Sequence, residues 1–170
     1  MKIQRTQKGR QTMSQSNGFT IIEVVLVLAI AGLIFMMVFI ALPALQRSQR
    51  DTQRKSDLAR ALTAVSNYAS ANRGTLPTEW DTFKTKYIRT TGEDQFIDPL
   101  GGAPGEDSYQ LVVASGSTDV PIFNSTATQN KIFVNTESKC GRDGAVVSGG
   151  SRYVALRMAL EGGGTICQNN

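Results

Sequence analysis

Histidine is absent from this 170-residue chain. Its absence excludes serine triads built on histidine, histidine-ligated metals and acid–base chemistry through an imidazole. The sequence also lacks a Cys-x-x-Cys pair, a phosphate-binding glycine loop and a nucleophile beside a base. We therefore expect a protein that is not an enzyme and that needs no cofactor.

Acidic residues are missing from the first 18 positions, where Lys2, Arg5, Lys8 and Arg10 supply four positive charges. The whole chain has 18 basic and 14 acidic side chains, so without these four the two signs balance at 14 each. A nucleic-acid binder would need a basic patch outside this segment. The composition thus argues against nucleic acid as the main direct partner.

Charged residues are also missing from Val24 to Leu42, within an apolar stretch that begins at Phe19. At 1.5 Å per residue, a helix over this stretch is long enough to cross a hydrocarbon core of about 30 Å. No small-residue cleavage site follows it, so we expect a retained transmembrane helix rather than a secretory signal peptide. Four basic residues follow the span and four precede it, so the positive-inside rule does not orient it.

Beyond the span, Gln46 to Asp57 is wholly hydrophilic but contains strong helix formers and neither glycine nor proline. Apolar residues then recur at the spacing of one helix face: Leu58, Leu62, Val65 and Ala69. We expect the helix to continue to Asn72, its second half carrying a domain on this stripe.

The remainder of the chain reads as short strands and loops, with a short helix from Asp81 to Arg89. Strands are expected at Tyr109 to Ala114, Lys131 to Asn135, Ala145 to Val147 and Tyr153 to Leu160. The glycines at 162–164 suit a hairpin turn into Thr165 to Cys167. The predicted fold class is α+β, with a long N-terminal helix packed on a small antiparallel sheet.

Cysteine is scarce, and both cysteines, Cys140 and Cys167, lie near the C-terminus. Two thiols in an exported protein usually pair, whereas two in the cytosol usually do not. If the C-terminal part is exported, we predict a disulfide between them that acts as a structural staple.

Glu23 is a lone carboxylate near the start of the apolar helix. A carboxylate at the bilayer centre costs roughly 2.5 to 3.5 kcal/mol on insertion scales, and less near the interface. Its simplest explanation is an acid favoured by the dipole at the helix N-terminus.

The residues from Gly18 to Glu23, Gly-Phe-Thr-Ile-Ile-Glu, follow a basic leader and precede a long uncharged stretch. This arrangement resembles the processing and assembly motif of the type IV prepilin family. The resemblance covers residues 1–72 well and the rest only in outline. It implies that a prepilin peptidase cuts between Gly18 and Phe19 and methylates the new amine of Phe19.

The resemblance also implies a polymer of identical subunits joined through their N-terminal helices. The ammonium of Phe19 in one subunit would pair with Glu23 of another, which gives a buried carboxylate its partner and sets the register. The family often has a helix-bending proline at the twenty-second mature position, which is Ile40 here, and Pro43 stands three residues later. We therefore expect a helix break between Gly32 and Pro43 in the filament.

Four segments follow: a leader at 1–18, a transmembrane and polymerisation helix at 19–43, an amphipathic half at 44–73 and a head domain at 74–170. The precursor is expected in the cytoplasmic membrane with its N-terminus inside, where it meets the pilus assembly machinery, and the product is expected in an extracellular filament. The filament could serve adhesion, twitching motility or DNA uptake. Alternatives are a pseudopilin of a secretion or competence system and, more distantly, a membrane-anchored binding or enzyme domain.

Two clusters of charged residues have competing explanations. One is expected to form a solvated helix face, with ion pairs between subunits as the alternative: Arg47, Arg50, Asp51, Arg54, Lys55 and Asp57. The other contains carboxylates that could bind calcium, as some related pseudopilins do, although their spacing matches no EF-hand loop: Asp94, Asp98, Glu106 and Asp107.

Overall fold

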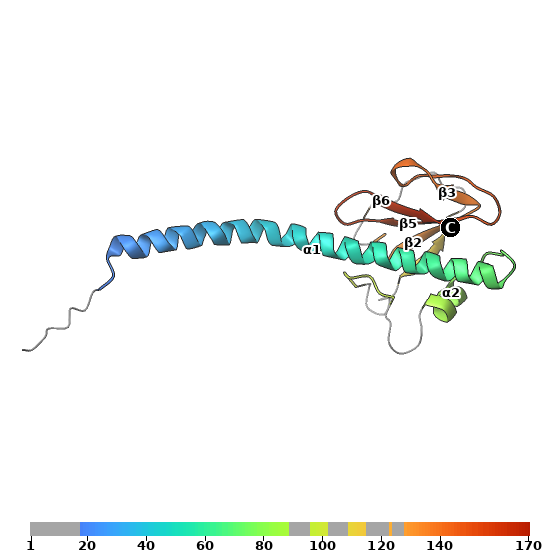
Figure 1. The fold of residues 1–170 in the computed structure, drawn as a ribbon, viewed down its shortest axis with the longest axis horizontal. Coiled ribbons are helices and arrows are strands. Elements are labelled where there is room, and N and C mark those ends of the chain that lie inside the picture. Colours follow the sequence, from blue (N-terminus) through green and yellow to red (C-terminus); the bar gives the residue numbers. More distant parts are fainter. Residues whose placement is uncertain (1–17, 89–95, 102–108, 115–122, 124–127) are drawn as a thin grey trace, which may run out of the picture. The chain divides into compact units, whose positions relative to one another are not determined.

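The computed structural model describes residues 18–88, 96–101, 109–114, 123 and 128–170 (Figure 1). The chain forms two compact units, one ending at Ala41 and one running from Leu42 to Asn170. A single helix, α1, spans Ile21–Ala71 and so contributes to both.

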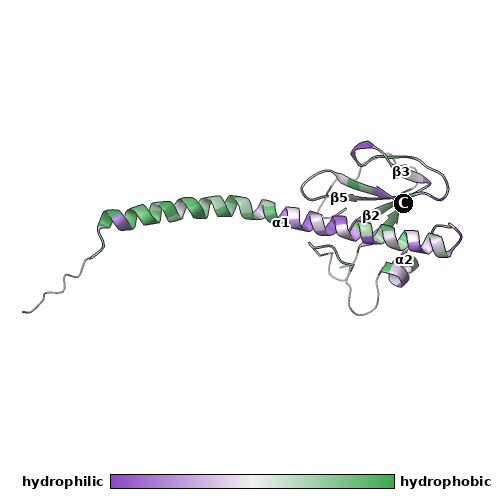
Figure 2. Ribbon diagram, viewed as in Figure 1, coloured by the Kyte–Doolittle hydropathy of each residue, from purple (hydrophilic) through white to green (hydrophobic). Residues whose placement is uncertain are grey.

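In the first unit, α1 is apolar (Figure 2). Its large hydrophobic side chains are exposed. By length and composition it could cross a membrane, and no other helix in the described residues could. The helix is continuous through Gly32 and Pro43. The expected break concerns the filament, so it stays a prediction.

The second unit begins with the rest of α1, which ends one residue before the predicted Asn72. Arg73 and Gly74 follow with positive φ angles of 56° and 84°, and the Gly74 amide donates to the Ala69 carbonyl at 2.7 Å. Glycine adopts this left-handed conformation without a steric penalty, so the turn ends the helix.

Short elements make up the rest of this unit. Two helical segments, α2 (Trp80–Phe83) and the π-helix η1 (Lys84–Ile88), occupy the predicted short helix, and η2 (Arg142–Gly144) is a 3₁₀ turn. The strands are β1 (Gln110–Val113), β2 (Lys131–Thr136), β3 (Ser138–Cys140), β4 (Val146–Ser148), β5 (Val154–Ala159) and β6 (Thr165–Asn169). β3 was not among the strands predicted from the sequence.

A four-stranded sheet of order β1-β2-β5-β6 forms the centre of the second unit, and β3 pairs with β4 in a separate ribbon. The α+β class is confirmed, but the sheet is mixed: β1 and β2 are parallel, and the other pairs are antiparallel. The predicted hairpin at the glycines of 162–164 joins β5 to β6. Parallel pairing of β1 and β2 requires a long connection, which residues 114–130 supply.

The core lies between α1 and the sheet. The predicted apolar stripe is confirmed, because Leu58 and Val65 are buried and Leu62 is partly buried. Against them pack sheet residues, including Ile132 and Leu156, and aromatic residues that precede the sheet. This packing holds residues 51–65 of α1 against the head.

The predicted disulfide is present: Cys140 at the end of β3 and Cys167 in β6 are bonded, with their Cα atoms 5.7 Å apart. It joins the β3–β4 ribbon to the edge of the main sheet.

Replacing both cysteines with serine is expected to destabilise the head by about 3 to 4 kcal/mol, because the bond closes a loop with a sequence separation of 27 residues. That is a large part of a typical domain's stability. Thermal unfolding of the double variant, Cys140→Ser with Cys167→Ser, checks this. An unchanged transition, or free thiols at both positions in denatured, unreduced protein, would contradict it.

Candidate functional site

The first candidate site is the start of α1. Gly18 and Phe19 precede the helix, and the Phe19 side chain is exposed. Apart from Gly18 and its chain neighbours, no heavy atom of the described residues lies within 4 Å of the position that a Cβ on Gly18 would occupy. The bond between these two residues therefore lies outside the helix in exposed chain, where a protease could reach it.

Glu23 occupies the first turn of α1, and its carboxylate bends back toward Thr20. Its Oε2 atom accepts hydrogen bonds from the Thr20 amide at 3.4 Å and from the Thr20 hydroxyl at 3.3 Å. This is one arm of a capping box, in which an acid three residues inside the helix satisfies the amide of the capping residue. In a single chain, Glu23 is thus an exposed helix cap.

The second candidate site is a polar cluster where α1 enters the head. The expectation of a solvated helix face was wrong for three of its members, since Arg54 has no exposed surface and Asp51 and Asp57 are also buried. It holds for Arg47 and Lys55, which are exposed.

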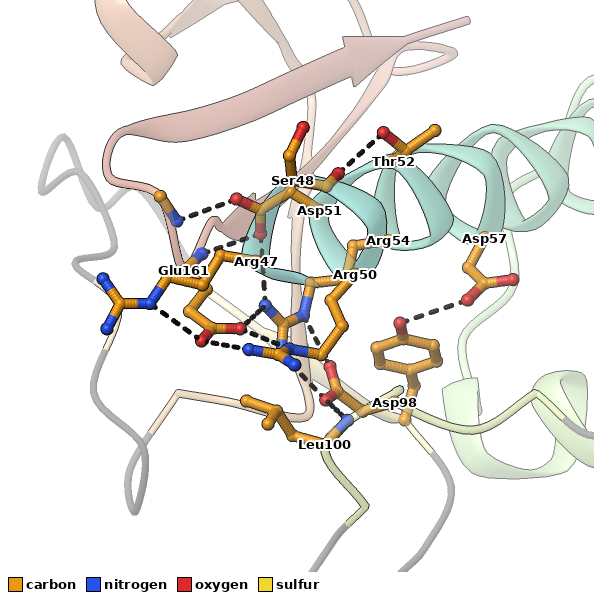
Figure 3. A network of polar contacts seen from close by, with 12 residues as sticks. Arg47, Ser48, Arg50, Asp51, Thr52, Arg54, Asp57, Asp98, Leu100 and Glu161 are labelled. Atoms are coloured by element: carbon orange, nitrogen blue, oxygen red, sulfur yellow. Dashed lines mark hydrogen bonds and ion pairs between the residues drawn. The ribbon is translucent and has the colours of Figure 1, made fainter. Parts of the chain in front are cut away.

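Arg54 lies at the centre of this cluster (Figure 3). Its Nε and Nη2 atoms donate to the two carboxylate oxygens of Asp98 at 2.8 and 2.9 Å, and its Nη1 donates to Asp51 Oδ1 at 3.2 Å. Burial lowers the pKa of Arg54, but its hydrogen bonds and charge interaction with Asp98 outweigh burial, and the net shift is upward. Arg54 therefore stays charged and is paired on two sides.

Asp51 connects α1 to the turn between β5 and β6. Its Oδ1 accepts from the Glu161 amide and its Oδ2 from the Gly162 amide, both at 2.8 Å. A Cβ at Gly162 would lie 2.9 Å from Asp51 Oδ2, so a larger residue here would have to displace the carboxylate. The carboxylate thus holds a turn about 110 residues away in the sequence.

Glu161 completes the cluster. Arg50 donates to both of its oxygens at 2.7 and 2.6 Å, and these bonds lower the pKa of Glu161. Arg47 lies farther away, with its Nε 3.6 Å from Glu161 Oε1.

A hydrogen bond from Tyr109, the residue before β1, attaches this strand to α1. The Tyr109 hydroxyl donates to Asp57 Oδ2 at 3.1 Å, and burial raises the pKa of Tyr109 well above its ordinary value. Tyr109 therefore remains a neutral donor at physiological pH.

The spacing of residues in α1 could have predicted that members of this cluster are buried. Asp51 and Arg54 precede Leu58, Ala61 and Val65 at alternating spacings of three and four, so all five share the helix face that packs on the head. Charged residues that continue an apolar stripe are candidates for burial.

The calcium hypothesis retains little support in the described residues. Asp94, Glu106 and Asp107 lie outside them, and Asp98 is bound by Arg54. Within the part of the chain that the structure describes, no three potential ligand residues gather into a metal site.

Comparison of the chain with protein-family models, with curated proteins and with solved structures yields no match.

Proposed function

We propose that this protein is a structural subunit of a type IV pilin-like filament. The observation that carries the proposal is the Gly18-Phe19 bond directly before a cap that uses Glu23, at the start of an exposed apolar helix. Cleavage there would create an ammonium next to a lone carboxylate. In a bundle of staggered helices, that carboxylate can pair with the ammonium of another subunit, and the pairing selects one register.

The proposal gives the two halves of α1 different roles. Residues 19–43 anchor the precursor in the cytoplasmic membrane and later form the filament core with other copies. Residues 44–71 belong to the head, which would be exported and would form the filament surface. A disulfide in the head supports export, because such bonds persist in oxidising compartments.

A pseudopilin is the second candidate, because the same motif would serve a short periplasmic filament. Shearing cells of the native organism separates the two. We expect this chain to be the dominant protein of long sheared filaments. A chain found only in short periplasmic assemblies would favour the pseudopilin, and a chain found in no filament would favour a membrane-anchored domain.

The mature protein is expected to begin at Phe19 with a methylated amine. N-terminal sequencing and mass spectrometry of assembled filaments check both features. Replacing Gly18 with a bulky residue should block processing, whereas the same change at Gly32, within the membrane segment, should not. Filaments that retain residues 1–18 would contradict the prediction.

A further inference from the structure

A polar groove runs along α1 immediately after the membrane segment. It measures about 380 Å³, at the lower end of the range for ligand pockets. Its lining comes from one face of the helix and from the β5–β6 turn: Ala44, Arg47, Ser48, Asp51, Thr52, Lys55 and Gly162.

The groove presents cationic and hydroxyl donors. Arg47 keeps 59% of its side-chain surface exposed, and its only ion pair within the described residues is the long one to Glu161. Lys55 is exposed and has no ion pair there, and the Ser48 hydroxyl has no hydrogen bond to another described residue. All three side chains are therefore available to a ligand.

The carboxylate in the groove is already compensated. Asp51 accepts from the amides of Glu161 and Gly162 and pairs with the buried Arg54. Its charge and its hydrogen-bonding capacity are thus directed into the head. The accessible groups that remain favour an anion that accepts several hydrogen bonds.

We propose that this groove binds the phosphate of an anionic phospholipid headgroup, while the protein is in the membrane. Arg47 is the first charged residue after Glu23 and follows Leu42, the end of the predicted membrane span, by five positions. Ser48 and Lys55 are separated by two helical turns on the same face. The first turns beyond a transmembrane span lie at the level of the headgroups, where basic residues attract anionic lipid. The inference rests on the membrane insertion that the proposed function requires.

Arg47 and Ser48 would hold the phosphate, and Lys55, two helical turns farther from the membrane, would add only longer-range attraction for the anionic headgroup. Arginine suits the inner position because its planar group can donate two parallel hydrogen bonds to phosphate. A carboxylate from a second subunit could reach the same groove, but it would meet these residues only after assembly, whereas lipid surrounds them beforehand.

The test uses the full chain in a neutral maltoside detergent, titrated with dihexanoyl phosphatidylglycerol, dihexanoyl phosphatidylcholine or inorganic phosphate. Amide chemical shifts of residues 44–55 report binding. We expect the anionic lipid to bind at least tenfold more tightly than the zwitterionic one. Arg47→Gln should weaken it about fivefold, which corresponds to about 1 kcal/mol per cation near a membrane surface. Lys55→Gln should weaken it measurably but less, because Lys55 lies farther from the surface.

Arg142→Gln is the matched control, because Arg142 is an exposed cation in η2 that does not line the groove, and its removal should leave binding unchanged. Lys55→Gln alone keeps the test valid if Arg47→Gln disturbs Glu161. Equal binding of the two lipids, or no effect of either groove substitution, would overturn the proposal. Inorganic phosphate that binds as tightly as the lipid would overturn the headgroup assignment. A chain that does not insert into membranes at all would instead contradict the proposed function.

Discussion

Replacing Glu23 with leucine is expected to leave the precursor made, inserted and cut after Gly18, yet to yield few or no surface filaments. The substitution removes the partner of the Phe19 ammonium in an apolar filament core. Leaving one member of a buried ion pair unpartnered typically costs about 3 to 5 kcal/mol. Electron microscopy of cells with matched protein levels measures the result.

The capping geometry of Glu23 calls for a sharper comparison than leucine alone. Glutamine at the same position can still accept the hydrogen bonds from Thr20, because capping boxes use either residue, but it carries no charge. If Glu23 only caps the helix, Glu23→Gln should assemble normally. If it pairs with an ammonium, Glu23→Gln should fail nearly as completely as Glu23→Leu.

Glu23→Asp completes the series, since it keeps the charge but shortens the reach, and we expect intermediate piliation. A Thr20→Ala variant is the matched control for the cap, because it removes the hydroxyl hydrogen bond without touching the carboxylate. It should form filaments. Normal piliation by both the leucine and the glutamine variants would remove the main physical argument for a polymerising subunit.

Replacing Arg54 with methionine is expected to cause the largest loss of stability in the head. The side chain is fully buried, and its removal leaves Asp51 and Asp98 as buried carboxylates with incomplete partners. Breaking such a pair from one side typically costs about 3 to 5 kcal/mol. For a domain of this size, we expect the midpoint of thermal unfolding to fall by about 10 °C or more.

Two further variants distinguish the effect of losing the buried charge of Arg54 from the effect of losing its packing. Adding Asp98→Asn to Arg54→Met should recover part of the loss, because one of the unpaired charges is removed while the hydrogen bond to the Leu100 amide is kept. Arg50→Met should have a smaller effect, since Arg50 keeps 24% of its side-chain surface exposed to water. Circular dichroism of the full chain in neutral detergent follows all three.

Equal destabilisation by Arg54→Met and Arg50→Met, or no recovery in the double variant, would contradict the prediction. It would indicate that the packing of the Arg54 side chain, and not its charge, stabilises the head. The expected pattern would instead show that the cluster holds α1 to both the Asp98 turn and the β5–β6 turn. Asp98 holds the first turn to Arg54, and the amides of Glu161 and Gly162 hold the second to Asp51.

Much of this protein follows from local sequence. The span from Phe19 to Leu42, the stripe from Leu58 to Val65 and the turn at Arg73 and Gly74 each depend on residues within a few helical turns, where spacing alone determines which side chains share a face. The partners of the disulfide also followed from the sequence, because two cysteines allow only one internal pair, whereas its formation was predicted only for an exported head. The motif from Gly18 to Glu23 is likewise local, which is why it carries the functional proposal.

Tertiary structure decided whether the charges of α1 meet water or protein. Arg54 looked like part of a solvated face, because its partner Asp98 lies 44 residues away and the turn held by Asp51 about 110 residues away. The parallel pairing of β1 and β2 was not predicted either, because the sequence of a strand does not specify the direction of its neighbour. A charged side chain can be buried only where a distant segment supplies the opposite charge at hydrogen-bonding distance, and the folded chain alone determines that position.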